Sequence, residues 1–332
     1  MKRATAALVV LAALLAVLTS MFTHKVMASG TIQTVFIILM ENHNWTDLGL
    51  TPGNCASCAA PYMMNTLAQQ GAFASRYFNP PSNHPSEPNY VWLEAGTCNF
   101  SDSSCSNYAS DNDPGSNGND TSSTAHLVTM MNNAGISWKG YMESAGGSCP
   151  LSSTGEYAAK HDPFVFFNDV TGNLNSSNAY CNSHIVDYSN FATDLASGNL
   201  ARYVWITPNL IDDMHDGTIG DGDTWLSNNI PAIMASNAYK NNGMIFIVFD
   251  EGEGGSQSFD TGDGPIYALV LSPLGKVGYT NTISYDHSSW VRTVQNIFNL
   301  HPPSSLTYLG NAGSATDLSD LFLSGAIPSG LH

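Results

Sequence analysis

Residues 35–42, Val35-Phe-Ile-Ile-Leu-Met40-Glu41-Asn42, join a continuous apolar run to an acidic and an amide side chain. An unbroken apolar run of this length is typical of a strand that is buried on both faces of a parallel sheet. A second run, Met244-Ile-Phe-Ile-Val-Phe249, leads directly into Asp250-Glu251. Because ligands bind at the carboxyl ends of parallel strands, both polar pairs are expected at the ligand-binding edge of one sheet.

Further apolar runs alternate with helical patterns along the chain. The expected strands are residues 35–40, 138–142, 203–207, 244–249 and 267–271, and the expected helices are 62–70, 125–133, 225–239 and 290–300. This alternation predicts an α/β protein whose central, mostly parallel sheet is covered by helices on both faces. A chain of 332 residues can bury one large core, so we expect one domain with loop insertions. Residues 98–124, rich in Ser, Asn, Asp and Gly, are interpreted as such an insertion.

The N-terminus has the pattern of a secretory signal. Lys2 and Arg3 precede a long apolar run, and Val26-Met27-Ala28 supplies small residues at a cleavage position. We therefore expect residues 1–28 to be a signal peptide and residues 29–332 to be the mature domain, secreted, periplasmic or at the cell surface. An uncleaved membrane anchor is the alternative, although the apolar core is short for a full span.

The composition is strongly acidic. The chain has 27 Asp and Glu against 10 Lys and Arg, and its formal net charge is −17. Removing a signal that contains Lys2, Arg3 and Lys25 takes three positive charges away, which leaves about −20. Such a surface repels nucleic-acid phosphates and anionic lipid headgroups. We therefore expect no nucleic-acid partner and, after signal cleavage, no stable membrane insertion.

All six cysteines lie in the expected mature domain. An even number of cysteines outside the cytoplasm favours disulfides. Proximity along the chain predicts the pairs Cys55–Cys58, Cys98–Cys105 and Cys149–Cys181. A redox or zinc half-site at Cys55-x-x-Cys58 is the alternative, and it is disfavoured because a second such motif is absent from the sequence.

The segment Asn83-His84-Pro85-Ser86-Glu87-Pro88-Asn89-Tyr90 contains the candidate nucleophile. Pro85 and Pro88 restrict the backbone around Ser86, and Pro88 suits the first turn of a helix. Ser86 is therefore expected near a helix N-terminus, where backbone N–H groups favour phosphate. A base or a bound metal must lower its pKa before it can attack. Asn89, one turn further on, can donate to phosphoryl oxygens. The alternative is that Ser86 only caps the helix.

The two polar pairs at the strand ends are candidate metal ligands. Glu41 and Asn42 follow the first apolar run, and Asp250 and Glu251 follow the second. Carboxylate and amide oxygens suit a divalent cation such as Ca²⁺, Mg²⁺, Mn²⁺ or Zn²⁺. Either pair alone is more often a loop or capping feature, but two pairs that each end an apolar strand favour a metal site.

Three histidines stand in polar sequence contexts: His161, His215 and His287. Taken singly, each is more often structural. His215 is the strongest candidate because it lies among acidic residues after an expected strand. Imidazole can ligate a metal, and imidazolium can bind phosphate or protonate a leaving oxygen.

Other polar residues are given no catalytic role. Asp221 and Asp223, in Gly-Asp-Gly-Asp, are interpreted as a solvated turn rather than as calcium ligands. His43, His126 and His184 have no supporting context in the sequence.

Taken in order, the motifs resemble those of a known family. They are Glu41-Asn-His43, His84-Pro-Ser-Glu-Pro-Asn-Tyr90, His161-Asp-Pro-Phe164, Pro208-Asn-Leu210 with Asp213-Met-His-Asp216, Phe249-Asp-Glu-Gly252 and Asp286-His-Ser-Ser289. This set resembles the bacterial and fungal phosphoesterase family that includes acid phosphatases and phosphatidylcholine-type phospholipases C. The resemblance runs from about Thr34 to Leu300. It implies the alkaline phosphatase superfamily and its three-layer α/β/α sandwich.

The resemblance also implies roles for individual residues. It implies that Glu41, Asn42, Asp250 and Glu251 bind a divalent metal, and that Ser86 is the nucleophile bridging to that metal. It further suggests that a phosphate pocket is lined by His161, His215 and His287. The phospholipase branch typically has Glu-Asn-Arg-Ser-Phe-Asp where this chain has Glu41-Asn-His-Asn-Trp-Thr46. That departure favours a phosphomonoesterase.

We therefore expect an exported, metal-dependent acid phosphatase that hydrolyses small phosphomonoesters through a phosphoserine intermediate. A phospholipase C that cleaves phosphatidylcholine-type lipids is the first alternative. A sulfatase or phosphodiesterase on the same scaffold is the second, because this scaffold hosts several ester chemistries. A non-catalytic secreted Ca²⁺-binding protein is the third.

Overall fold

The structure is a computed structural model that describes residues 30–49, 53, 55, 57–253 and 264–332. The expected signal peptide, residues 1–28, lies outside the described residues. Among the described helices, none combines the length and the apolar character that a membrane crossing requires.

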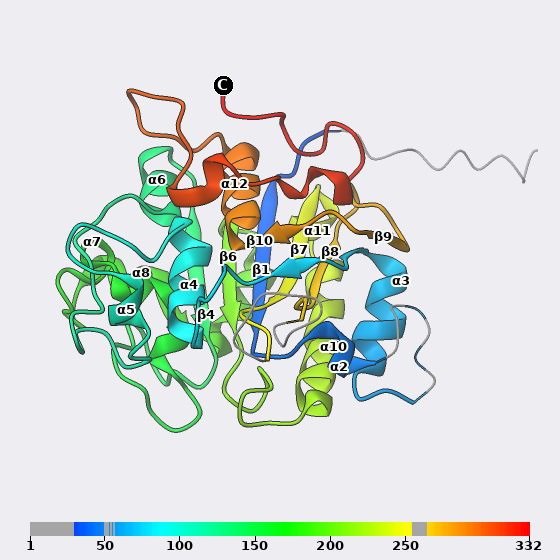
Figure 1. Ribbon diagram of the computed structural model, residues 1–332, viewed down its shortest axis with the longest axis horizontal. Coiled ribbons are helices and arrows are strands. Elements are labelled where there is room, and N and C mark those ends of the chain that lie inside the picture. The colour runs from blue at the N-terminus through cyan, green and yellow to red at the C-terminus, as the bar shows by residue number, and fades with distance from the viewer. Residues whose placement is uncertain (1–29, 50–52, 54, 56, 254–263) are drawn as a thin grey trace, which may run out of the picture.

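A mostly parallel sheet forms the centre of the molecule (Figure 1). Its eight strands lie in the order β5-β4-β6-β1-β7-β8-β2-β9. Their bounds are β1 (Thr34–Met40), β2 (Ala72–Ala74), β4 (Trp138–Met142), β5 (Ile185–Asp187), β6 (Tyr203–Thr207), β7 (Gly243–Phe249), β8 (Ala268–Leu271) and β9 (Tyr279–Asn281). β8 runs antiparallel to both of its neighbours, β7 and β2, and the other pairs are parallel. A separate parallel pair joins β3 (Tyr77–Phe78) to β10 (Tyr285–Asp286).

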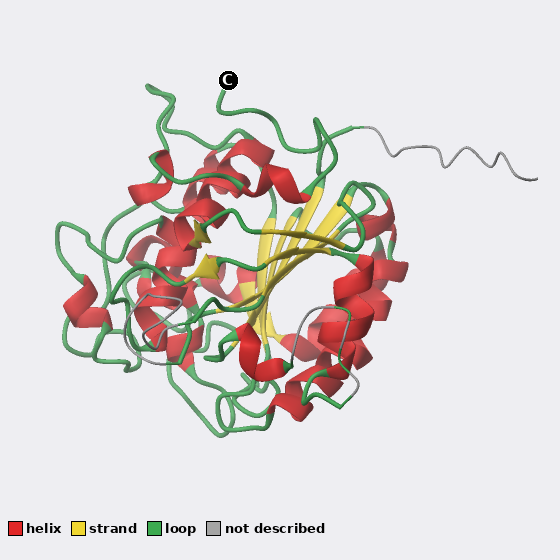
Figure 2. Ribbon diagram, turned by 45° about the vertical axis from the view of Figure 1, so that its right-hand side comes forward, coloured by secondary structure: helices red, strands yellow, loops and turns green. Residues whose placement is uncertain are grey.

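Helices cover both faces of this sheet (Figure 2). One layer contains α4 (Ser86–Ala95), α6 (Leu127–Asn133) and α12 (His287–Phe298), which contact one another. The other contains the π-helix η1 (Tyr62–Leu67), α3 (Ala68–Gln70), α10 (Ile219–Ala235) and α11 (Asn237–Lys240). The shorter helices are α2 (Trp45–Leu48), α5 (Cys105–Tyr108), η2 (Ala159–His161), η3 (Pro163–Phe166), α7 (Asn168–Thr171), α8 (Ala179–His184), η4 (Tyr188–Asn190), α9 (Phe191–Ser197), η5 (Gly310–Gly313) and η6 (Leu318–Leu321). The arrangement is the α/β/α sandwich that the sequence predicts.

The five predicted strands are confirmed as β1, β4, β6, β7 and β8, with ends that differ by no more than one residue. β1 and β7 are buried almost throughout, because strands at the centre of a sheet covered on both faces contact only other apolar groups. Met40 lies opposite Phe249, and the Asp250 backbone N–H donates to the Met40 carbonyl at 2.9 Å. The polar residues that follow these two strands therefore leave the sheet side by side.

The predicted solvated turn at Asp221 and Asp223 is wrong, because both residues lie within α10. Asp221 forms a reciprocal capping box with Thr218 at the start of this helix. The Asp223 carboxylate accepts hydrogen bonds from the backbone N–H groups of Tyr62 and Met63, at 2.9 and 2.8 Å. It therefore satisfies the otherwise unpaired donors at the start of η1, a helix that is distant in the sequence.

All three predicted disulfides are present: Cys55–Cys58, Cys98–Cys105 and Cys149–Cys181. The predicted insertion, residues 98–124, contains α5 and has little other regular structure. It also buries Tyr108, Asn119 and Thr121. The Asn119 side chain donates to Glu87 Oε1 at 2.8 Å, so this segment packs against the first turn of α4.

Candidate active site

Five of the predicted site residues come from four segments that meet at the carboxyl edge of the sheet. Glu41 follows β1, and Asp250 and Glu251 follow β7. Ser86 begins α4, and His215 lies in the loop after β6. Because β1 pairs with β6 on one side and with β7 on the other, all three strands deliver their following residues to the same place.

Ser86 is buried at the first residue of α4, as the sequence predicts. Its hydroxyl donates to Glu41 Oε2 at 2.8 Å. The hydroxyl of Tyr90, one helical turn further on, donates to the other Glu41 oxygen at 2.6 Å. The residue in the capping position is Pro85, and the Ser86 hydroxyl instead donates to Glu41. The alternative, in which Ser86 only caps the helix, therefore does not agree with the structure.

Three carboxyl groups at this edge of the sheet have almost no access to water. Glu41 and Asp250 are fully buried, and Glu251 is 4% exposed. Burial raises the pKa of Asp250 well above its ordinary value, and the nearby charges of Glu41 and Glu251 raise it further. Burial also raises the pKa of Glu41, which the charge of His161 partly offsets. Buried carboxylates at this spacing are costly unless a positive charge lies among them.

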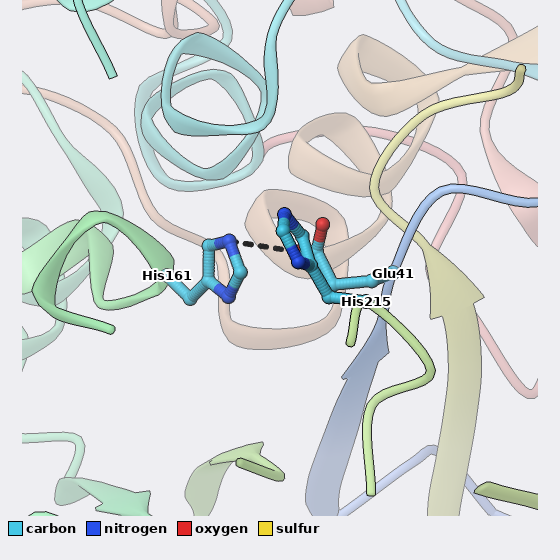
Figure 3. A group of neighbouring side chains, drawn as sticks. All are labelled: Glu41, His161 and His215. Atoms are coloured by element: carbon cyan, nitrogen blue, oxygen red, sulfur yellow. Dashed lines mark ion pairs between the residues drawn. The ribbon is translucent and has the colours of Figure 1, made fainter. Parts of the chain in front are cut away.

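The unpartnered atoms of this cluster suit a cation. In the described part of the chain, neither carboxylate oxygen of Asp250 has a hydrogen-bond partner, although both are buried. Glu41, His161 and His215 each present one ligand atom, and these atoms lie within 4.8 Å of one another (Figure 3). Carboxylate and imidazole donors suit a divalent metal. The donor set therefore fits a metal ion bound between the ends of β1 and β7.

His161 is buried between two acidic residues. Its Nε2 lies 3.3 Å from Glu41 Oε1, and its Nδ1 lies 3.3 Å from Asp213 Oδ2. Its ring stacks on Tyr90 with centroids 5.0 Å apart. Burial lowers the pKa of His161 to about 4 despite the opposing charge of Glu41, so the imidazole is neutral near neutral pH. Burial also raises the pKa of Asp213 to about 8.

His215 lies at the exposed rim of the cluster. The Asp213 carboxylate accepts the His215 backbone N–H at 2.8 Å and so holds the loop in place. Its ring centroid is 5.5 Å from that of His161, and its Nδ1 lies 2.8 Å from Asp216 Oδ1. His215 is thus the histidine among the three candidates that both reaches the cluster and meets solvent.

His287 occupies a different position from the one expected. It is fully buried at the start of α12, and its Nε2 lies 2.6 Å from the backbone carbonyl of Asp250. Its Nδ1 lies 3.4 Å from the Tyr77 hydroxyl. Burial lowers the pKa of His287 to about 3, so the ring is neutral and Nε2–H donates to that carbonyl. The ring therefore contacts the backbone of Asp250 and has no surface exposed to solvent.

The two asparagines of the predicted site lie in different places: Asn89 contacts Glu251, and Asn42 follows Glu41. The Asn89 side-chain amide donates to Glu251 Oε2 at 2.9 Å and to the Asn83 carbonyl at 2.8 Å. It therefore orients Glu251, which also lies 2.7 Å from His84 Nδ1. Asn42 is half-buried next to Glu41 at the end of β1.

Comparison with known proteins identifies the family. Residues 53–301 match the sequence profile of the Phosphoesterase family. The chain belongs to this family. A phosphatidylinositol-3-phosphatase of Mycobacterium tuberculosis is 30% identical to this phosphoesterase over 88% of the chain and 84% of its own length. Family membership makes the protein a hydrolase of phosphoester bonds, in place of the non-catalytic alternative.

Fungal acid phosphatases are also similar to this phosphoesterase. The phosphate-repressible acid phosphatase of Penicillium chrysogenum is 28% identical over 57% of this chain and 43% of its own. An acid phosphatase of Aspergillus fumigatus is 27% identical over 78% of this chain and 53% of its own. The chain thus spans about half the length of these fungal relatives.

Solved structures share the fold. A phosphonate monoester hydrolase of Agrobacterium radiobacter superposes with a TM-score of 0.56 at 12% identity, over 90% of this chain and 79% of its own. A protein in the alkaline phosphatase superfamily from Vibrio parahaemolyticus has a TM-score of 0.54 at 10% identity, over 82% and 67% of the two chains. The predicted alkaline-phosphatase-like architecture is confirmed.

The sequence patterns did not identify two residues that lie near this cluster, Tyr90 and Lys160. Tyr90 lies four residues after Ser86, a spacing that places both side chains on one face of a helix, so the signal was available. Lys160 precedes His161, and nothing in its local sequence marks it. Its position becomes informative only when Asp111, far away in the sequence, is seen to bind it.

Proposed function

We propose that this phosphoesterase is an exported, metal-dependent acid phosphatase that hydrolyses small phosphomonoesters through a phosphoserine at Ser86. The observation that carries the proposal is the 2.8 Å hydrogen bond from the Ser86 hydroxyl to Glu41 at the first residue of α4. The hydroxyl therefore lies where helix N–H groups favour a phosphoryl group and where a buried carboxylate can accept its proton.

Four residues would hold the divalent cation: Glu41, Asn42, Asp250 and Glu251. The two unpartnered oxygens of Asp250, both buried, support this assignment. When bound, the cation would supply Lewis-acid stabilisation of the phosphoryl oxygens and lower the pKa of the Ser86 hydroxyl. The donors are compatible with Ca²⁺, Mg²⁺, Mn²⁺ or Zn²⁺.

In the first half of the reaction, Ser86 Oγ attacks phosphorus and its proton passes toward Glu41. Tyr90 holds that carboxylate in place through its 2.6 Å hydrogen bond. The first N–H groups of α4 stabilise the phosphoryl oxygens. The leaving alcohol takes a proton from His215, the histidine at the solvent-exposed rim. In the second half, His215 accepts a proton from water as that water attacks the phosphoserine. The P–Oγ bond breaks, Glu41 returns its proton to Ser86 Oγ, and phosphate is released.

The remaining predicted residues act on these groups indirectly. His161 lies 3.3 Å from Glu41 as a neutral ring beside the phosphoryl site. We assign Asn89 to positioning Glu251, and His287 to positioning the backbone of Asp250. Both roles replace the direct contacts with phosphate that the sequence suggested.

Export and substrate class have separate support. Three disulfides and the signal-like pattern of residues 1–28 favour an oxidising location outside the cytoplasm. Similarity to proteins named acid phosphatases favours phosphomonoesters over phosphatidylcholine-type lipids.

The test compares p-nitrophenyl phosphate with p-nitrophenylphosphorylcholine, with and without EDTA. We expect faster turnover of the monoester, loss of activity in EDTA, and a fall of at least about 1,000-fold in Ser86→Ala. Ser101→Ala, at an exposed serine, is the matched control and should retain full activity. Preference for the phosphorylcholine ester would make the enzyme a phospholipase C. Full activity in Ser86→Ala would refute the nucleophile.

A further inference from the structure

A pocket of about 460 Å³ opens next to the proposed catalytic residues. Its lining includes Asp111, Asp113, Tyr157, Lys160, Leu210 and His215. His215 belongs to the cluster with Glu41 and His161, so this pocket adjoins the place where we expect phosphoryl transfer. The pocket has polar and apolar walls and carries charges of both signs.

Lys160 is the lysine or arginine that lines this pocket, among the residues that the structure describes. It belongs to η2 and directly precedes His161. Its Nζ forms an ion pair with Asp111 Oδ2, and its side chain is 19% exposed. Asp111 Oδ1 in turn accepts the backbone N–H of Glu87 at 3.2 Å. A single carboxylate therefore ties Lys160 to the residue that follows the proposed nucleophile.

The positive charge of the Lys160 ammonium group matters for binding an anionic substrate, because the site is rich in acidic side chains. Glu41 and Asp250 are buried acidic groups beside the proposed nucleophile, and in its ionised form each opposes the approach of a phosphate dianion. The Nζ of Lys160 forms its ion pair with Asp111, and this pair holds the positive charge at the wall of the pocket that His215 also lines.

Among the described residues, Glu87 does not form an ion pair with Lys160. Its Oε1 accepts a hydrogen bond from the Asn119 side chain at 2.8 Å. Its Oε2 accepts the backbone N–H of Asn112 at 2.9 Å, which fixes the segment that carries Asp111. Lys160 is consequently held at the pocket wall with Asp111 as its one direct ion-pair partner among the described residues.

We propose that Lys160 is a substrate-binding residue that contacts the phosphoryl group of a phosphomonoester and makes the site prefer this dianion to a monoanionic phosphodiester. This inference rests on the proposed function and specifies its substrate class. Above its second pKa of about 6, a monoester carries one more negative charge than a diester. Removing one fixed positive charge should therefore weaken binding of the monoester more when both are compared at pH 7 or above.

The experiment measures kcat/KM for p-nitrophenyl phosphate and for bis(p-nitrophenyl) phosphate in Lys160→Met, together with the inhibition constant of inorganic phosphate. We expect kcat/KM for the monoester to fall by about 10- to 100-fold, and for the diester by less than about threefold. The inhibition constant of phosphate should rise in parallel with the loss on the monoester. Lys160→Arg, which keeps the charge, should recover most of both.

Two further variants separate charge from folding. Lys139→Met is the matched control, because Lys139 also pairs with an aspartate, Asp194, at 2.7 Å and lies outside this pocket. The double variant Lys160→Met/Asp111→Asn leaves no unpaired carboxylate, and it should show the same selective loss. Equal losses on both esters, or an unchanged inhibition constant, would overturn the role of Lys160. Failure of the proposed function would instead appear as the absence of monoester turnover in the wild-type enzyme.

Discussion

At the scale of single residues, Glu41 is held by two hydroxyl groups from one helix. Ser86 donates to one of its oxygens and Tyr90 to the other. The Tyr90 hydroxyl donates to Glu41, so we regard Tyr90 as a positioning residue. Its ring also stacks on His161, which joins two parts of the site through one side chain.

Tyr90→Phe tests this positioning role. The variant keeps the stacked ring but leaves one buried oxygen of Glu41 without its donor, so we expect kcat to fall about tenfold with little change in KM. The free energy of unfolding should fall by about 1–2 kcal/mol. Steady-state kinetics and urea denaturation measure both effects.

The control for this variant is Tyr108→Phe, which removes a buried hydroxyl that hydrogen-bonds Ser103 at 2.8 Å. It should lower stability to a similar extent and leave kcat unchanged. If both variants lost kcat equally, the effect would be one of general packing and the role of Tyr90 would be wrong.

At the scale of elements, a buried histidine joins three helices. His126 precedes α6, and its Nδ1 lies 3.1 Å from Glu94 Oε1 on α4. Its Nε2 lies 3.1 Å from Asp169 Oδ1 on α7. Burial would lower the pKa of His126, but its hydrogen bonds to Asp169 and Glu94 raise it above the ordinary value. α4 carries Ser86 at its other end, so this junction also supports the site.

His126→Gln should change the dependence of stability on pH. A histidine with a raised folded-state pKa contributes stability fully below its unfolded pKa of about 6.5, and this contribution is lost as pH rises through the folded value. We therefore expect the variant to be less stable than wild type by about 3 kcal/mol at pH 6, and by less at pH 9.

Denaturant unfolding at several pH values measures this difference. Part of it should persist at pH 9, because the His126 ring also stacks on Phe167 with centroids 3.9 Å apart. A difference that grows from pH 6 to pH 9 would contradict the proposed charge on His126.

At the scale of elements, sequence patterns predict the strands at the centre of the sheet but not those at its ends. β1 and β7 are continuous apolar runs because they are buried on both faces. β2, β5 and β9 have three residues each, too short to show a period. They are strands because a neighbouring strand offers hydrogen bonds, which depends on tertiary structure.

At the scale of the whole molecule, each disulfide stabilises the folded chain by an amount that increases with the length of the loop it closes. Cys149 and Cys181 are 32 residues apart, whereas Cys98 and Cys105 are 7 apart. A cross-link that closes a longer loop removes more conformational entropy from the unfolded chain.

Replacing Cys149 and Cys181 together with alanine should lower the free energy of unfolding by about 3–4 kcal/mol, against about 2 kcal/mol for the Cys98 and Cys105 pair. Equilibrium denaturation of the two double variants measures the difference. The larger loss is expected for the first pair, and the reverse order would contradict the loop-length argument. Activity under native conditions should survive in the first variant, because neither residue belongs to the proposed site.

The sequence by itself determined the features whose signals are local. Five buried strands, a helix N-terminus near Ser86, the pairing of each cysteine with its nearest cysteine along the chain and the acidic residues at two strand ends all follow from the order of residues in the sequence. Local patterns suffice because apolar continuity, proline geometry and chain proximity act over a few residues.

Tertiary structure alone decided which side chains face one another. Asp223 satisfies the start of η1, His287 supports the backbone of Asp250, and Asp111 binds Lys160 beside the proposed nucleophile. Each of these contacts joins residues far apart in the chain. Their partners are determined by the packing of the sheet and its helix layers, which brings polar groups from distant segments within hydrogen-bonding distance.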